Sequence, residues 1–286
     1  MSVSSPVWRD HLVQQAQWVM ELLNPDGIVL DETFTAWGYD HHPQRKGPLS
    51  PGGIELMRRL GYERYGAQGG DWGALITTQI GLRDPDHLAG IHVNMPVAIP
   101  PIGQADPNEG LTDAEKATLA EMEQWNQNEA GYQRIQGTKP QTVGFGLNDS
   151  PAGLAAWIVE KFRAWSDCGG DVESTIAKDR MLANISLYWF TGCIGASFWP
   201  YYARMHGPWP IPDGGPIAVP TAYAAFPTEI VRPPRSLAKR TYTDIRQWSV
   251  MKTGGHFAAM EQPEALARDL LDFLRPLRER SGTGGS

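Results

Sequence analysis

The chain has 286 residues, of which 41% are hydrophobic, and this is enough apolar material for a sizeable core. The formal net charge of −7 argues against nucleic acid or an anionic membrane as the main partner, because both attract basic surfaces. Two cysteines are too few for a disulfide framework, and no apolar run is long enough for a membrane span. Since the first residues also lack signal-peptide features, we expect a cytoplasmic protein.

The amino-terminal part gives few structural signals. Apolar residues at helical spacing predict an amphipathic helix over 7–23, and 27–37 has room for one short strand. Residues 38–53 are rich in Gly, Pro and His and predict a loop. His41 and His42 have no third metal ligand at a usual spacing, so we expect no metal there. We treat 1–53 as a segment without an assigned role.

A glycine-rich turn between a short extended run and an amphipathic helix marks the centre of the chain. Within 62–82, Gly69 and Gly73 lie two residues before and two residues after Asp71. Nucleophiles of α/β-hydrolases stand on such an elbow, flanked by small residues. A carboxylate nucleophile forms an ester and suits displacement at an alkyl carbon. The alternative is an ordinary turn in which Asp71 caps the helix.

The order of the predicted elements indicates an α/β fold. A helix over 54–60 leads into the elbow strand, and a strand over 88–96 after the elbow helix completes a βαβ unit with a parallel sheet. Helices are predicted from a capping box at Thr112 toward Ile135, over 150–165 and within 172–205. Strands over 216–222 and 245–251 and a helix over 263–277 follow.

We therefore predict an α/β-hydrolase core, with a mostly parallel sheet and helices on both faces, into which an all-helical cap is inserted. The core comprises 54–100 and 214–280, and the cap comprises 101–213. A helical cap above a nucleophile at the end of a strand encloses a pocket.

The elbow needs a base that activates water for ester hydrolysis, and an acid that orients the base. His256 follows the last predicted strand, where a loop faces the same crevice as the elbow. Glu229 follows the preceding strand and is the candidate acid. The order nucleophile, acid, histidine is that of α/β-hydrolases. Glu229 could instead be a helix N-terminal charge, and Asp213 is a competing acid that precedes its strand.

Long motifs resemble the microsomal-type epoxide hydrolases, which include the juvenile-hormone epoxide hydrolases. The resemblance covers about 54–277 and is close in QGGDWGA, GYQRIQGTKPQTVGFGLNDSPAGLAAWIVEKF, LYWFTG, FPTEI and GGHFAAMEQPE. It implies that an apolar epoxide is opened to a vicinal diol without a metal or organic cofactor. The implied roles are nucleophile for Asp71, acid for Glu229 and base for His256.

The same resemblance implies that two cap tyrosines hold and protonate the epoxide oxygen. By motif these are Tyr132 and Tyr202, although Tyr201 is adjacent to the second. Packing of the cap is the alternative role for both phenols. An Asp followed by Trp also resembles the haloalkane dehalogenases, in which Trp72 would help to hold a halide. In an epoxide hydrolase, Trp72 would offer its backbone N–H to the oxyanion.

The front of the core departs from this family. Its members carry His-Gly-x-Pro upstream of the elbow as an oxyanion donor, whereas the one His-Gly pair here is His206-Gly207, after the cap. Four strands that normally precede the elbow are not visible in 1–53, so this part of the core is incomplete or atypical. An uncovered strand edge would favour a homo-oligomer. A truncated homologue that binds apolar ligands without catalysis is a further alternative.

Overall fold

The computed structural model describes residues 54, 57–98, 109–207 and 217–279. Within them, one sheet holds four strands in the order β1 (Tyr65–Gly69), β2 (Leu88–Val93), β3 (Thr221–Ala225) and β4 (Ile245–Val250). All neighbouring strands are parallel. The predicted helix over 7–23, the strand within 27–37 and the loop over 38–53 lie outside the described residues.

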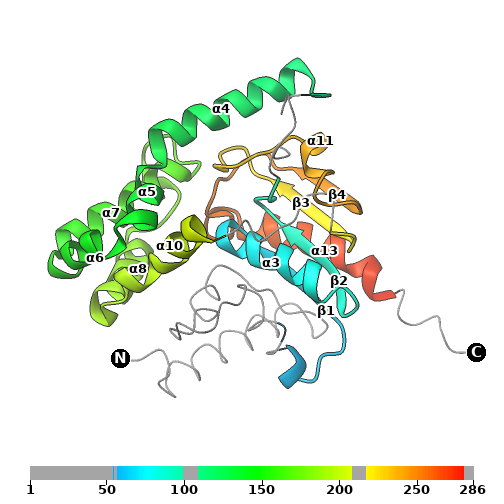
Figure 1. Cartoon of the computed structure of the whole chain (residues 1–286), viewed down its shortest axis with the longest axis horizontal. Helices are drawn as coiled ribbons and strands as arrows, with labels where there is room; N and C mark the ends of the chain where they lie inside the picture. Colours follow the sequence, from blue (N-terminus) through cyan, green and yellow to red (C-terminus); the bar gives the residue numbers. More distant parts are fainter. Residues whose placement is uncertain (1–53, 55–56, 99–108, 208–216, 280–286) are drawn as a thin grey trace, which may run out of the picture.

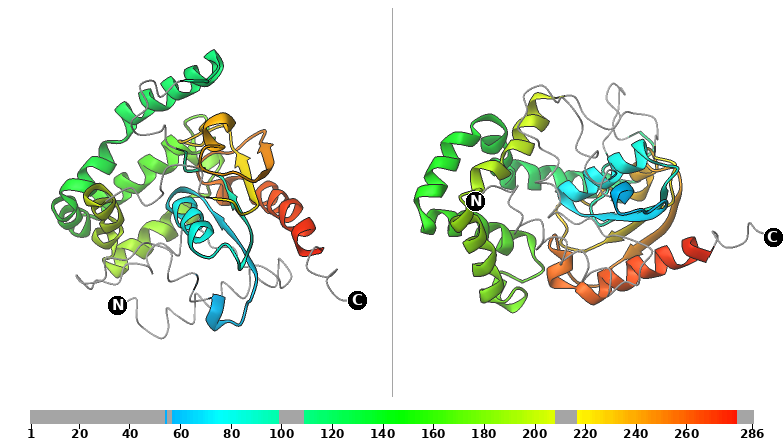
Figure 2. Two further views of the ribbon diagram at one scale, coloured as in Figure 1. Left: turned by 45° about the vertical axis from the view of Figure 1, so that its right-hand side comes forward. Right: turned by 90° about the horizontal axis from the view of Figure 1, so that it is seen from below.

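Helices cover both faces of the sheet, as predicted. Helix α3 (Asp71–Arg83) lies on one face and α13 (Pro263–Glu279) on the other, as Figure 2 shows from below. Two consecutive residues of β2 illustrate this arrangement, because successive side chains of a strand point to opposite faces of the sheet. Ile91 packs with Ile76 and Ile80 of α3 in one core cluster, whereas His92 faces Asp269 and Phe273 of α13. A sheet covered on both faces requires the apolar strands that the sequence contains.

The chain leaves the sheet after β2, forms a group of helices, and returns with β3. Figure 1 shows this group to one side of the sheet. Its elements are α4 (Asp113–Glu129), α5 (Gly131–Thr138), α6 (Pro140–Asp149), α7 (Pro151–Trp165), η2 (Val172–Ser174), α8 (Lys178–Thr191), α9 (Ile194–Ser197) and α10 (Trp199–His206). Two short helices, α11 (Arg235–Ala238) and α12 (Ala258–Glu261), flank β4.

The predicted helix starts in this group are confirmed by their caps. At α4, Glu115 N–H donates to Thr112 Oγ1 (3.3 Å) and Thr112 N–H donates to Glu115 Oε2 (2.8 Å), which completes the capping box. At α7, Ser150 Oγ accepts a hydrogen bond from Gly153 N–H (3.0 Å). Each cap satisfies backbone donors that the first turn of a helix leaves free.

Two predicted boundaries differ from the structure, and one helix has no predicted counterpart. The single helix toward Ile135 is two helices, α4 and α5, because the chain turns at Ala130 and carries Tyr132 into the interior. Helix α6 was not predicted, since its glycines and proline obscure the helical pattern. The strand predicted over 216–222 begins only at Thr221, after Pro220, which has no N–H to donate to a ladder.

Candidate active site

The elbow has the sharp geometry that the sequence predicts. Strand β1 ends at Gly69 and α3 begins at Asp71, whose φ of +44° lies in the left-handed region that side chains rarely adopt. A Cβ on Gly69 would lie 2.1 Å from the carbonyl oxygen of Gly73, so the turn requires glycine at position 69. Gly70 occupies the N-cap position and no side-chain cap forms, so Asp71 does not act as the cap of α3.

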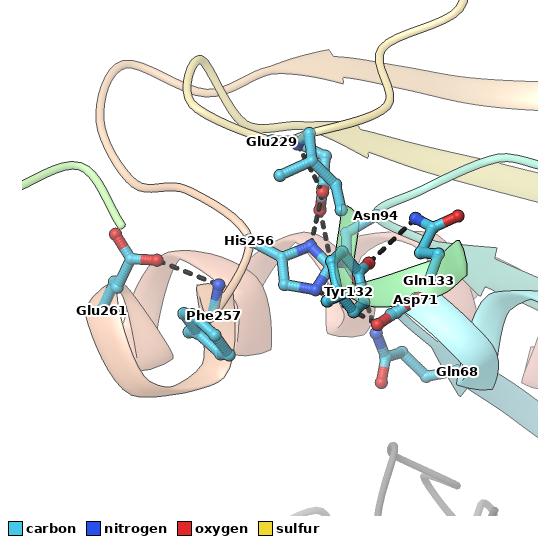
Figure 3. Close-up of polar contacts among 10 residues, drawn as sticks. Gln68, Asp71, Asn94, Tyr132, Gln133, Glu229, His256, Phe257 and Glu261 are labelled. Carbon is cyan, nitrogen blue, oxygen red and sulfur yellow. Dashed lines mark hydrogen bonds and ion pairs between the residues drawn. The ribbon is translucent and has the colours of Figure 1, made fainter. Parts of the chain in front are cut away.

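Three of the predicted residues form one line of contacts (Figure 3). Glu229 Oε1 lies 2.6 Å from His256 Nδ1, and His256 Nε2 lies 3.4 Å from Asp71 Oδ2. The side chains of Glu229 and His256 are fully buried, whereas that of Asp71 is 24% exposed. Glu229 follows β3 and His256 follows β4, so the carboxyl ends of neighbouring strands bring the three together.

Glu229 is held by further donors, one of which the sequence did not suggest. Its Oε1 accepts a hydrogen bond from Ile230 N–H (2.7 Å), and its Oε2 accepts one from Asn94 Nδ2 (3.5 Å). Asn94 is fixed in turn, because its Oδ1 accepts a hydrogen bond from Gln68 Nε2 (3.0 Å). Asn94 follows β2, and its position after a parallel strand is the signal that could have identified it.

The two carboxylates control the charge of the imidazole between them. Burial lowers the pKa of His256, but the charge of Glu229, the charge of Asp71 and hydrogen bonds to both outweigh it. The pKa of His256 therefore lies well above its ordinary value. Loss of either negative charge would lower the pKa of His256.

Two phenols of the cap helices face this line, and one of them was predicted. Tyr132 in the first turn of α5 is buried, and its hydroxyl accepts a hydrogen bond from Gln133 Nε2 (2.9 Å; Figure 3). Burial and the charge of Asp71 raise the pKa of Tyr132. Burial and the charge of Asp71 also raise the pKa of Tyr201, whose ring centroid lies 5.8 Å from that of Tyr132.

The second phenol is Tyr201 and not the predicted Tyr202, which the structure places away from the site. Tyr202 is 36% exposed, and its ring stacks on His206 with 4.1 Å between centroids. Consecutive residues of a helix point about 100° apart, so only one of two adjacent tyrosines can face the nucleophile. The ring of Trp72 lies 5.1 Å from that of Tyr201, edge to face, so the Trp72 side chain packs against Tyr201.

Aromatic and apolar side chains surround the reactive groups. Tyr132, Trp165 and Ile230 form the buried part of one cluster, against which Met95, Trp125, Trp157, Tyr201, Val231 and Phe257 pack. Lys161 places its ammonium 4.9 Å from the ring centroid of Tyr132 and 5.4 Å from that of Trp165. These surroundings suit an apolar ligand better than a charged one.

The other candidates from the sequence are a metal site at His41 and His42 and the competing acid Asp213. Within the described ranges, no group of three or more His, Cys, Asp or Glu residues is arranged to hold a metal ion. His41, His42 and the competing acid Asp213 lie outside those ranges.

Comparisons with known proteins identify relatives of this chain. No protein-family model matches the chain. Epoxide hydrolase 1 of Sus scrofa is 34% identical over 285 residues, which covers 88% of this chain and 61% of the pig protein. The crystal structure of the juvenile hormone epoxide hydrolase of Bombyx mori matches with a TM-score of 0.69 and 33% identity, covering 80% of this chain and 58% of that one. Over most of its length, this chain is homologous to the microsomal and juvenile-hormone epoxide hydrolases.

A fungal epoxide hydrolase has the same α/β-hydrolase fold. The structure from Aspergillus niger matches with a TM-score of 0.67 and 28% identity, covering 82% of this chain and 60% of that one. The present epoxide hydrolase homologue thus spans about three fifths of the length of each of these relatives. None of the helices that could be described is long and apolar enough to pass through a membrane.

The charge coupling in this epoxide hydrolase homologue can be tested directly. In Asp71→Asn, we expect the pKa of His256 to fall, because one anion and its hydrogen bond are lost while Glu229 remains. A pH titration of the ¹⁵N-labelled imidazole by NMR measures it. Asp113→Asn removes an exposed carboxylate at the start of α4 and should leave the pKa unchanged. An unchanged or higher pKa in Asp71→Asn contradicts the coupling.

Proposed function

We propose that the protein opens apolar epoxides to vicinal diols through an alkyl ester on Asp71. The line from Glu229 through His256 to Asp71, faced by two buried phenols, is the observation that carries this proposal. The homology to epoxide hydrolases supports the same reaction class. Because the chain spans only part of its relatives, the activity proposed is that of the site described here.

In the first half-reaction, a carboxylate oxygen of Asp71 attacks one ring carbon of the epoxide. A new C–O ester bond forms, the ring C–O bond breaks, and its electron pair stays on the ring oxygen. Ring strain alone leaves an alkoxide, which needs a proton at neutral pH. Tyr132 and Tyr201 both lie where the charge of Asp71 acts on them, and one phenol delivers that proton to the oxygen. The phenolate left behind regains a proton from solvent.

In the second half-reaction, His256 acts as the base. Ester formation removes the negative charge of Asp71, so one of the causes that raise the pKa of His256 disappears. The neutral imidazole then takes a proton from water through Nε2, while the water oxygen attacks the ester carbonyl. As the ester C–O bond breaks, the imidazolium gives its proton to the leaving diol oxygen. The new carboxyl group of Asp71 then loses its proton to His256 and is again a carboxylate. Glu229 stabilises the imidazolium through Nδ1.

The oxyanion of this second step has one evident donor in the described chain. Trp72 is the second residue of α3, where backbone N–H groups have no partner within the helix. The positive end of the α3 dipole lies at the same place and favours negative charge. The His-Gly-x-Pro motif that family members carry for this purpose is absent from the sequence. Loss of one such donor typically slows turnover by roughly a hundred- to a thousand-fold.

The phenol pair favours an epoxide over a haloalkane. A halide leaves as a stable anion and needs no proton, so a dehalogenase gains nothing from an acidic group that faces the nucleophile. Burial and the charge of Asp71 raise the pKa of both Tyr132 and Tyr201, whose ring centroids lie 5.8 Å apart. Their placement supports proton delivery to an oxygen formed beside Asp71.

Because Asp71 forms the ester and His256 is needed only to hydrolyse it, a variant of His256 should trap the ester. In His256→Gln we expect the ester to form but not to hydrolyse, because Asp71 needs no base to attack. After incubation with styrene oxide, intact-protein mass spectrometry should show the protein plus one substrate. His87→Gln, an exposed histidine 3 residues from its partner Asp84, is the control and should show no adduct. An unmodified His256→Gln protein, with a parent chain that turns over, contradicts the proposal.

The adjacent tyrosines give a matched pair for the acid. Loss of a general acid typically slows a step by roughly 10²- to 10⁴-fold. Because Tyr132 remains in Tyr201→Phe, we expect ester formation to slow by roughly 10²-fold, the lower end of this range. Tyr202→Phe should form the ester at the rate of the parent. The rate of ester formation, measured by rapid quench and mass spectrometry, decides between them. A larger loss in Tyr202→Phe would contradict the assignment of Tyr201.

A further inference from the structure

The loop that carries His256 is fastened to the end of cap helix α7 by a compact set of hydrogen bonds. Gly254 N–H donates to Asp167 Oδ2 (2.8 Å), and Asp167 N–H donates to Glu261 Oε2 (2.8 Å). Phe257 N–H donates to Glu261 Oε1 (3.0 Å; Figure 3). His256 N–H itself donates to the carbonyl oxygen of Trp165, the last residue of α7 (2.9 Å). Hydrogen bonds at His256 and at the residues on both sides of it therefore connect this loop to the end of α7 and to Glu261.

Each oxygen of Glu261 serves a different segment of the chain. Oε2 accepts from the end of the cap at Asp167, and Oε1 accepts from the loop at Phe257. The side chain of Glu261 therefore joins the two segments through both of its oxygens. Asp167 adds a second connection in the opposite direction, because its side chain accepts a hydrogen bond from Gly254 N–H of the loop.

The two backbones approach so closely that the loop has little freedom to shift. A Cβ on Gly255 would lie 2.4 Å from the carbonyl oxygen of Trp165. The indole of Trp165 also meets the imidazole of His256 edge to face, with 5.0 Å between ring centroids. A movement of the end of α7 would therefore move the ring of His256.

We propose that Asp167 and Glu261 are positioning residues, which clamp the His256 loop to the cap and keep Nε2 aimed at Asp71. This inference rests on the proposed function, because it concerns how the base is held for ester hydrolysis. The attacking water must lie between Nε2 and the ester carbonyl, so hydrolysis depends on the position of the imidazole. Ester formation by Asp71 does not require that base. The clamp therefore supports the second half-reaction and leaves the first nearly unchanged.

Glu261→Gln is the first test. A carboxamide offers one oxygen, so at least one of the two backbone N–H groups loses its acceptor and meets an NH₂ group instead. A misplacement of about 1 Å can slow a reaction by roughly a hundredfold. With styrene oxide we expect ester hydrolysis to slow by roughly ten- to a hundredfold, with ester formation unchanged within about twofold. The variant should accumulate the ester, and Glu264→Gln, an exposed carboxylate at the start of α13, should not.

Asp167 supplies a second test with a conservative partner. Asn keeps a side-chain oxygen that can accept from Gly254 N–H, whereas Ala has none. We expect Asp167→Asn to hydrolyse the ester nearly as the parent does, and Asp167→Ala to accumulate it. Destabilisation alone would lower the thermal midpoint of a variant without separating the two half-reactions.

The outcomes distinguish the clamp from the proposed function. If the parent forms and hydrolyses the ester, and Glu261→Gln and Asp167→Ala hydrolyse it at the parent rate, the clamp is overturned. If neither the parent nor His256→Gln forms an ester, the proposed function fails. Hydrogen exchange at the His256 and Phe257 amides then decides the clamp by itself. Faster exchange in Glu261→Gln than in Glu264→Gln supports it, and equal exchange overturns it.

Discussion

The close approach of the Gly69 backbone to the carbonyl of Gly73 allows the tight turn that presents Asp71 to the other reactive groups. With no Cβ at Gly69, the chain turns from strand β1 into helix α3 within a few residues and holds Asp71 at φ of +44°. Such a conformation costs free energy, roughly 1–3 kcal/mol, and persists only where the surroundings impose it. Burial of α3 against β1 and β2 supplies that constraint, so the core of the sheet supports the strained carboxylate.

The buried ionisable groups have to be paired, because an isolated charge in such a place is expensive. Glu229 is satisfied by His256, Ile230 N–H and Asn94, so its charge is balanced on both oxygens. His256 in turn depends on Glu229 and Asp71. The same pairing that makes the buried charges tolerable makes the protonation of His256 depend on the charge of Asp71. The contacts among Glu229, His256 and Asp71 therefore both stabilise the buried charges and serve the proposed chemistry.

Local sequence signals predicted the core of the site, because each of its residues follows a strand. Asp71 stands between two glycines, and Glu229 and His256 occupy turns after β3 and β4, so the parallel order of strands brings them together. The choice between Tyr201 and Tyr202 could not be made in this way, since it depends on the rotation of α10 against α5. Gln133, Asn94, Asp167 and Glu261 act through hydrogen bonds to residues whose proximity only the folded chain shows.

The origin of the oxygen in the diol tests the central claim most directly. The parent chain, in molar excess over styrene oxide, is allowed a single turnover in H₂¹⁸O. If Asp71 is the nucleophile, the first diol carries no label, and the peptide that contains Asp71 gains one ¹⁸O when water cleaves the ester. A first diol that carries ¹⁸O, with an unlabelled Asp71 peptide, would mean direct attack by water and would contradict the account.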